Sequence, residues 1–129
     1  RGLIIDNIPE IPFVIDDKIQ TIKKTQDIYS KLNELGFKDE MERVKKKSKK
    51  IRSGKGKRRG RKYKKKSSFL IVIKDDFGIY KAARNIPGID VIKIENLSIN
   101  DLAPGGLSGR LVIWTQSAFD ELKKYDELI

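Results

Sequence analysis

The chain has 129 residues, 36% of them charged, and a formal net charge of +11, which fits one small and very polar folded domain. It contains no cysteine and no histidine, and this excludes disulfides, thiolate metal sites and a histidine general base. No apolar run has the length of a membrane span and no signal peptide is visible, so we expect an intracellular protein. The chain begins with Arg1 rather than Met, which indicates a processed product or a fragment.

The positive charge is concentrated in one segment in the middle of the chain. Residues 43–66 hold 16 of the 29 Lys and Arg residues and no Asp or Glu, which leaves 13 basic and 18 acidic residues elsewhere, a net charge of −5. A mildly acidic body therefore carries one strongly cationic segment. Such a field attracts a polyanion, with nucleic acid as the first candidate and an anionic membrane as the second.

The first third of the chain has the pattern of one strand followed by two helices. Residues 13–15 are apolar and β-rich and form the first strand candidate. Apolar residues recur at helical spacing over 21–35, and Gly36 ends that helix. A second, shorter helix is predicted to begin at Asp39, with Glu42 in capping-box position, and to end in the basic segment.

Three further strands are predicted after the basic segment. Five consecutive apolar residues over 69–73 indicate a strand that is buried on both faces. The aspartate pair at 75–76 is placed to cap a helix that follows this strand. Residues 91–94 and 111–114 are the other two strand candidates.

Helix starts and a turn are expected in the last third of the chain. Ser98 with Asp101, and Ser117 with Asp120, have the spacing of helix N-terminal caps. The glycine-rich stretch 103–110, "APGGLSGR", could cradle a phosphate, but a turn before the last strand is the favoured interpretation.

The alternation of strands and helices predicts an α/β fold with a largely parallel sheet and helices on both faces. Phe77 and Trp114 are expected in its core. Four strands are few for such a sheet, so either residues 3–5 add a strand or the chain is part of a larger domain. We therefore expect a single α/β domain over 1–129 that carries a long basic loop. Residues 45–66 form its nucleic-acid-binding insert, whose charge does not distinguish RNA from DNA; the family resemblance given below implies an RNA-binding insert.

Glycines are interleaved with Lys and Arg in the basic segment. Gly54, Gly56 and Gly60 remove any helical tendency, so the segment is expected to have no shape of its own before it binds. Glycine lets a backbone approach phosphates, and Arg forks onto phosphate oxygens, while Tyr63 could stack on an unpaired base. The spacing in "SGKGKRRG" is not that of a Walker loop. These features favour nucleic-acid binding over a merely solubilising loop.

Two pairs of aspartates offer a competing hypothesis. Asp16-Asp17 and Asp75-Asp76 each follow a predicted strand, where doubly wound sheets place ligand sites, and their carboxylates could hold Mg²⁺. This pattern defines the alternative function, a small Mg-dependent phosphate-handling α/β enzyme. Helix capping explains the same residues more simply, because a helix is predicted after each pair. A general DNA-compacting protein is a third reading of the charge.

Four stretches of the chain, in order and along nearly its whole length, carry a family resemblance: "GLIIDNIPEIPFVIDD", "IRSGKGKRRGRKY", "AARNIPGIDV" and "NDLAPGGLSGRLVIWTQSAF". Together they resemble the ribosomal large-subunit protein L-four family, in its archaeal and eukaryotic branch. The similarity covers only the carboxyl-terminal half of that family.

The resemblance implies a structural constituent of the large ribosomal subunit that binds ribosomal RNA and supports subunit assembly. It implies large-subunit RNA and neighbouring large-subunit proteins as partners, a cytoplasmic location on the ribosome, and no membrane, small-molecule substrate, cofactor, metal or catalytic residue. The residues expected to contact RNA are cationic or aromatic: Lys49, Lys50, Arg52, Lys55, Lys57, Arg58, Arg59, Arg61, Lys62, Tyr63, Lys64, Lys65, Lys66 and Arg110.

Overall fold

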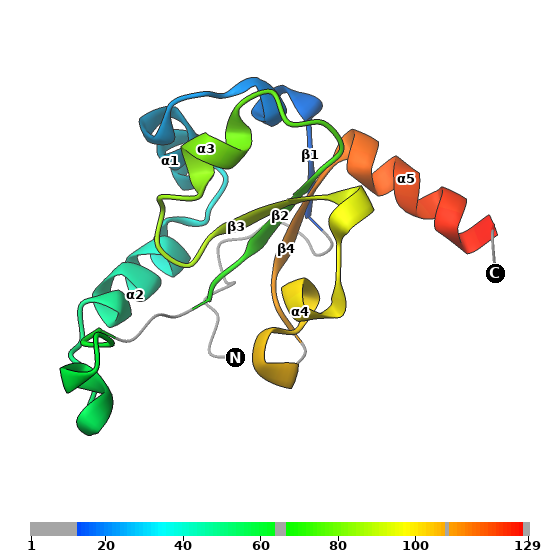
Figure 1. Cartoon of the computed structure of the whole chain (residues 1–129). Coiled ribbons are helices and arrows are strands. Elements are labelled where there is room, and N and C mark those ends of the chain that lie inside the picture. Colours follow the sequence, from blue (N-terminus) through cyan, green and yellow to red (C-terminus); the bar gives the residue numbers. More distant parts are fainter. Residues whose placement is uncertain (1–12, 64–66, 108, 128–129) are drawn as a thin grey trace.

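The computed structural model describes residues 13–63, 67–107 and 109–127, without the side chains of Ser48 and residues 125–127 (Figure 1). Four strands form one sheet in the order β1-β4-β2-β3, and all three strand pairs are parallel. The strands are β1 (Phe13–Ile15), β2 (Leu70–Ile73), β3 (Asp90–Lys93) and β4 (Val112–Thr115). The predicted parallel α/β sheet is confirmed, while the strand expected at residues 3–5 lies outside the described residues.

Helical segments connect these strands and cover the sheet. The α-helices are α1 (Thr25–Glu34), α2 (Lys38–Ser48), α3 (Ile79–Ala83), α4 (Ile99–Leu102) and α5 (Gln116–Glu127). Short 3-10 turns are η1 (Asp17–Thr21), η2 (Lys55–Arg58), η3 (Ile94–Asn96) and η4 (Pro104–Gly106). None of the helices described here is long and apolar enough to cross a bilayer.

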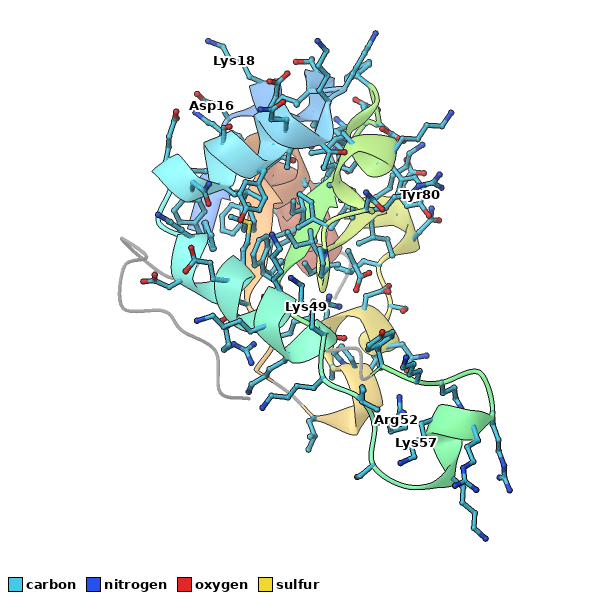
Figure 2. The ribbon with its side chains drawn as sticks, turned by 90° about the vertical axis from the view of Figure 1, so that its left-hand side faces the viewer. Asp16, Lys18, Lys49, Arg52, Lys57 and Tyr80 are labelled. Carbon is cyan, nitrogen blue, oxygen red and sulfur yellow. The ribbon has the colours of Figure 1, made fainter. Side chains whose placement is uncertain are left out.

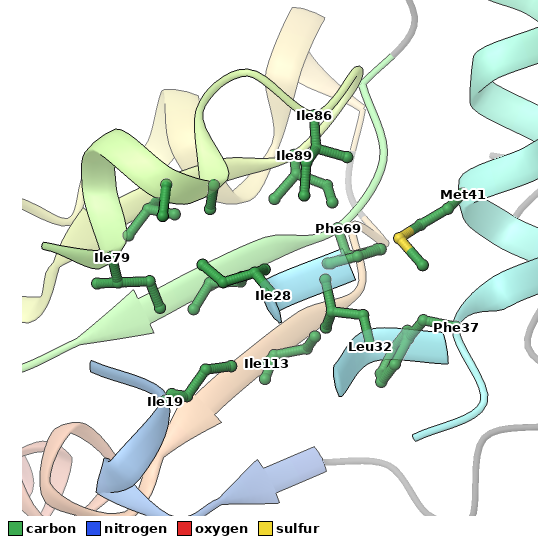
Figure 3. Close-up of a cluster of buried hydrophobic side chains, with 14 of the residues drawn as sticks. Ile19, Ile28, Leu32, Phe37, Met41, Phe69, Ile79, Ile86, Ile89 and Ile113 are labelled. Carbon is green, nitrogen blue, oxygen red and sulfur yellow. The ribbon is translucent and has the colours of Figure 1, made fainter. Parts of the chain in front are cut away.

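Two hydrophobic clusters lie on opposite faces of the sheet. On one face, α1, α2 and α3 pack over the sheet around Phe37, whose ring lies 5.2 Å from that of Phe13 and 5.0 Å from that of Phe69 (Figure 3). On the other face, α5 contributes Ala118 and Leu122 to a smaller cluster, and Figure 1 shows α5 across the sheet from α1 and α3. Helices on both faces therefore confirm the expected layering, and β2 is buried throughout, as its apolar run predicts.

Helix α2 differs from its prediction at both ends. Its N-cap is Phe37, so Asp39 lies in the first turn and the expected capping box with Glu42 does not start the helix. The helix also continues through three lysines of the basic segment to Ser48. Burial of Met41 and Val44 holds its inner face, and cations in the last turn interact favourably with the helix dipole.

Helix α5 has a local cap in Thr115, whose hydroxyl oxygen accepts the Ala118 N–H at 3.4 Å, and a second in Asp17, which the sequence gives no reason to select. The Oδ1 atom of Asp17 accepts hydrogen bonds from the Ser117 N–H at 3.0 Å and the Ser117 hydroxyl at 2.9 Å. Asp120 instead accepts from the side chain of Gln116, so the predicted Ser117–Asp120 pair is wrong. The other predicted cap is confirmed, because Asp101 accepts from the N–H and hydroxyl of Ser98.

The two aromatic residues expected in the core have different environments. Trp114 is partly buried against the second cluster, with its ring 6.2 Å from that of Phe119. Phe77 is 54% exposed, so its prediction as a core residue is wrong. Phe77 lies in the loop between β2 and α3, where Asp76 binds the N–H groups of Gly78 and Tyr80 and the loop does not turn inward.

Replacing the central aromatic ring should cost far more stability than replacing the exposed one. We expect Phe37→Ala to lower the free energy of unfolding by about 3–5 kcal/mol, because it opens a cavity between two other rings. Phe77→Ala is the matched control and should change it by less than about 1 kcal/mol. Urea unfolding followed by Trp114 fluorescence measures both, and equal losses would contradict this packing.

Candidate nucleic-acid interface

The described part of the basic segment after α2 projects from the folded body. We call residues 49–63 the basic loop; it begins where α2 ends and lies beyond that end of the helix (Figures 1 and 2). Lys64–Lys66, which are also expected to contact RNA, lie outside the described residues. The chain returns to the body at Ser68 and enters β2.

The basic loop is closed on itself by backbone hydrogen bonds. The Arg52 N–H donates to the Lys62 carbonyl at 2.7 Å, the Arg52 Nε–H donates to the Arg61 carbonyl at 3.1 Å, and Ile51 and Tyr63 form an antiparallel bridge. Inside this closure, the Gly56 carbonyl accepts N–H groups from two arginines. The structure thus gives the loop a hairpin-like form where the sequence predicts none.

Glycine allows this form. Gly54 and Gly60 have φ angles of +88° and +78°, which residues with a side chain rarely adopt. At Gly56 an added Cβ would lie 2.9 Å from the Cδ atom of Arg52, so the backbone there is packed against that side chain. From the sequence, these glycines are expected only to prevent helix formation. In the structure they also permit the hairpin-like form of the basic loop.

The cations of the basic loop are available to an external anion. Arg52 is partly buried, and the other predicted RNA contacts in the described loop are exposed: Lys49, Lys50, Lys55, Lys57, Arg58, Arg59, Arg61, Lys62 and Tyr63. No ion pair joins a described cation of this loop to a carboxylate of the described chain. Counterions or a bound polyanion would relieve their mutual repulsion.

One side of the basic loop forms a cleft with an aromatic wall. The cleft has a volume of about 440 Å³ and is lined by Arg52, Gly60, Arg61, Lys62 and Tyr63. Tyr63 is 50% exposed, and the Lys62 Nζ lies 5.4 Å from the centre of its ring, within the range of a cation–π contact. An exposed ring flanked by cations suits an unpaired nucleobase and its phosphate.

Arg110 lies inside the protein rather than on this surface. Its Nε donates to the Ser68 carbonyl at 2.8 Å, its Nη1 donates to the Asp101 carbonyl at 2.8 Å, and its Nη2 contacts Asp90 at 2.6 Å. The guanidinium is buried and bonded on three sides to the protein, so we remove Arg110 from the proposed RNA-binding set. Its observed role is to join the start of β4 to the start of β2.

A buried carboxylate joins the two ends of the basic loop. Glu40 of α2 is fully buried; it binds the Arg43 guanidinium and accepts a hydrogen bond from the Ser68 hydroxyl at 2.8 Å. The hydrogen bond to Glu40 raises the pKa of Arg43, so this arginine stays charged. Because Glu40 precedes the basic segment and Ser68 follows it, their contact holds together the two parts of the folded body between which that segment runs.

Sequence reasoning did not identify Glu40 or Ser68. A signal was present for Glu40, since it lies on the buried stripe of α2 with Phe37, Met41 and Val44 at helical spacing. A charged residue in an apolar stripe indicates a buried partner. Nothing comparable distinguishes Ser68, whose partner is 28 residues away.

The carboxyl edge of the sheet is closed by protein contacts. Between β2 and β4, where the following helices go to opposite faces, the side-chain oxygen of Gln20 accepts from the Lys74 N–H at 3.0 Å and the Thr115 hydroxyl at 3.3 Å. Nearby, hydrogen bonds from Lys124 and Lys74 lower the pKa of Glu121, so this partly buried carboxyl stays ionised. Gln20 occupies the position where doubly wound sheets bind ligands.

One aspartate of each pair acts as a cap in this fold. Asp17 caps α5 rather than the segment that directly follows it, and Asp76 binds the N–H groups of Gly78 and Tyr80 at the start of α3. Within the described part of the chain, no three acidic residues are grouped in a way that could hold a metal ion. The alternative of a magnesium-dependent enzyme therefore finds no support in this arrangement.

Removing the buried carboxylate should unfold the base of the loop. We expect Glu40→Ala to lower the free energy of unfolding by about 3–5 kcal/mol, because Arg43 and Ser68 would lose their shared buried partner. Glu42→Ala, two residues along the same helix and exposed, should change it by less than about 0.5 kcal/mol. Chemical denaturation measures both, and a Glu40→Ala variant as stable as the Glu42→Ala variant would contradict the assigned role.

Comparisons with known proteins agree with the geometry. Residues 4–125 match the ribosomal protein L4/L1 family. The large ribosomal subunit protein uL4 of Methanocaldococcus jannaschii is 45% identical to this chain over 124 residues, which are 96% of this chain and 48% of that protein. Protein uL4 of Methanococcus aeolicus is 40% identical over 124 residues, which are 96% of this chain and 49% of that protein. Protein uL4A of Schizosaccharomyces pombe is 44% identical over 119 residues, 92% of this chain and 32% of that protein. The chain thus spans about half the length of the archaeal relatives and less of the yeast one, and, since the match covers nearly all of it, the chain belongs to the ribosomal protein L4/L1 family.

Proposed function

We propose that this chain is a structural constituent of the large ribosomal subunit that binds ribosomal RNA through the basic loop and supports subunit assembly. The observation that carries the proposal is a closed loop of mostly exposed cations, none of them ion-paired to a carboxylate of the described residues, carried by a folded body of net negative charge. Family membership supports ribosomal RNA as the polyanion, because the relatives are named as proteins of the large ribosomal subunit. The proposed location is the cytoplasmic ribosome.

The mechanism is electrostatic and needs no catalytic group. Lysines and arginines of the loop neutralise phosphates where RNA segments come close together, and the condensed counterions are released. If about half of the 16 cations of residues 43–66 meet phosphates, the logarithm of the binding constant should fall with the logarithm of salt concentration at a slope of about −5 to −7. Binding in this way stabilises the folded form of the RNA.

The loop's own structure adds selectivity to this charge effect. Arg52 closes the hairpin through the carbonyls of Arg61 and Lys62, so it positions its neighbours rather than acting only as a free cation. The cleft beside Tyr63 suits an unpaired base, which favours structured RNA with exposed bases over uniform duplex DNA. This favours RNA binding over general DNA compaction.

The acidic body is proposed to face neighbouring ribosomal proteins. Ile99 and Leu102 of α4 and Leu107, just after η4, are exposed, and Ile99 is 81% exposed. Exposed apolar side chains gathered near one helix are typical of protein contact surfaces. They belong to a part of the chain separate from the cationic segment.

Neutralising three cations at the tip of the loop should weaken RNA binding in a salt-dependent way. For Lys57→Gln, Arg58→Gln and Arg59→Gln combined, we expect the salt slope on a large-subunit rRNA transcript to become shallower by about 2–3, which is about 0.7–0.9 per lost contact. Fluorescence anisotropy over a salt series measures it.

The control removes the same charge elsewhere. Lys18, Lys81 and Lys123 are exposed and lie outside the basic segment, and replacing all three by Gln should leave the slope almost unchanged. Identical slopes for the two triple variants would overturn the proposed role of the loop.

A further inference from the structure

We propose that the RNA backbone continues from the basic loop into a groove along the exposed face of α2, so that this helix is a second part of the interface. This inference rests on the proposed RNA-binding function and deepens it. The groove has a volume of about 510 Å³, and all of its described lining comes from α2 and the residues just after it: Asp39, Glu42, Arg43, Lys46, Lys47 and Lys50. The spacing of these residues places them on one face of the helix.

The basic end of the groove adjoins the basic loop. Lys46 and Lys47 lie in the last turns of α2, and Lys49 and Lys50, the first residues of the basic loop, follow directly after the helix (Figure 2). No ion pair of the described chain engages Lys46, Lys47 or Lys50. A phosphate chain bound by the loop therefore meets further unpaired cations as it approaches the body.

One wall of the groove is fixed in place. Arg43 is tied to the buried carboxylate of Glu40 by its Nε at 2.9 Å and by its Nη2. Glu40 is in turn bonded to Ser68, so this turn of α2 is held against the start of β2. The lysines that follow are consequently presented from a rigid helix, which lowers the entropy lost when they bind.

The groove also has a direction. Its other end carries the exposed Glu42, whose negative charge opposes a phosphate chain. The footprint is therefore expected to run from the basic loop past Lys50 and Lys47 and to stop before Glu42. The C-terminal end of a helix carries a partial negative charge that disfavours anions, but this amounts to about half an elementary charge against three whole lysine charges.

The groove suits a polyanion better than a small molecule. Every described residue that lines it carries a charged group and the groove is open to solvent, whereas small-molecule sites are enclosed and lined mostly by apolar and aromatic residues. The competing interpretation is an ordinary solvated helix face whose lysines contact only water. The two interpretations differ in what neutral substitutions on α2 do to RNA binding.

The test removes charge on α2 without touching the basic loop. Lys46→Gln combined with Lys47→Gln should make the salt slope on the large-subunit rRNA transcript shallower by about 1.5, from two lost contacts. Lys81→Gln combined with Lys123→Gln removes the same charge from α3 and α5 and should leave the slope unchanged. If the α2 pair behaves like this control pair, the inference is overturned.

Reversing the charge of Glu42, at the acidic end of the groove, should increase RNA affinity, a result that a misfolded variant would not give. Glu42→Lys should extend the footprint, tighten binding and steepen the slope by about 0.7–0.9. Glu95→Lys makes the same charge change at an exposed position in η3 and should have a smaller effect. Equal gains in RNA affinity from the two variants would show that only net charge matters and would overturn the inference that RNA binds along the groove.

These measurements also distinguish failure of the groove inference from failure of the proposed RNA-binding function. A wild-type chain that binds the transcript no better than it binds heparin would overturn both. A loop variant that loses its salt slope while the α2 variants do not would leave the proposed function standing and overturn the groove alone.

Discussion

The contact between Glu40 and Ser68 joins the two ends of a strongly repulsive segment, and the rest of the interface depends on it. A fully buried carboxylate is costly unless it is bonded, and here Arg43 and Ser68 satisfy it. Ser68 is held further by Arg110, which bonds its carbonyl and reaches Asp90. This chain of polar contacts ties α2 to the starts of β2, β3 and β4, so the cationic loop leaves from a point fixed against most of the sheet.

That constraint explains why a mid-chain position suits a binding element. Cations held close together repel one another, and a free tail would relieve the repulsion by spreading out. Fixing the loop at both ends and closing it through Arg52 prevents this, so part of the ordering entropy is already lost before RNA arrives. Gly54 and Gly60 make the closure possible at φ angles that other residues disfavour. The acidic remainder of the chain would repel a polyanion bound at the loop and so confine it to the cationic segment.

Most of the fold could be read from local patterns, whereas the contacts that position the site could not. The apolar run of β2 and the Ser98–Asp101 cap are encoded within a few residues, and both are confirmed. The cap of α5 by Asp17 joins residues 100 apart, and only the folded sheet brings them together. Arg110 is a second contact that local patterns could not reveal. Its charge and its position after a glycine turn suggested a contact with RNA, but the side chain is buried and bonds to Asp90. The exposed cations of the basic loop could be predicted because composition alone makes them impossible to bury.

The central claim is that the folded body presents the cationic segment and makes it a better ligand for RNA than its charge alone. Comparing the chain with a synthetic peptide of residues 43–66 tests this most directly, since the peptide keeps all 16 cations and lacks the acidic body. Both are titrated onto the same large-subunit rRNA transcript at equal salt. The account predicts that the chain binds the transcript at least about tenfold more tightly than the peptide, although the net charge of the chain is lower. A tenfold difference corresponds to about 1.4 kcal/mol, which is the ordering free energy that the folded chain no longer loses on binding. A peptide that binds as tightly as the chain would contradict it.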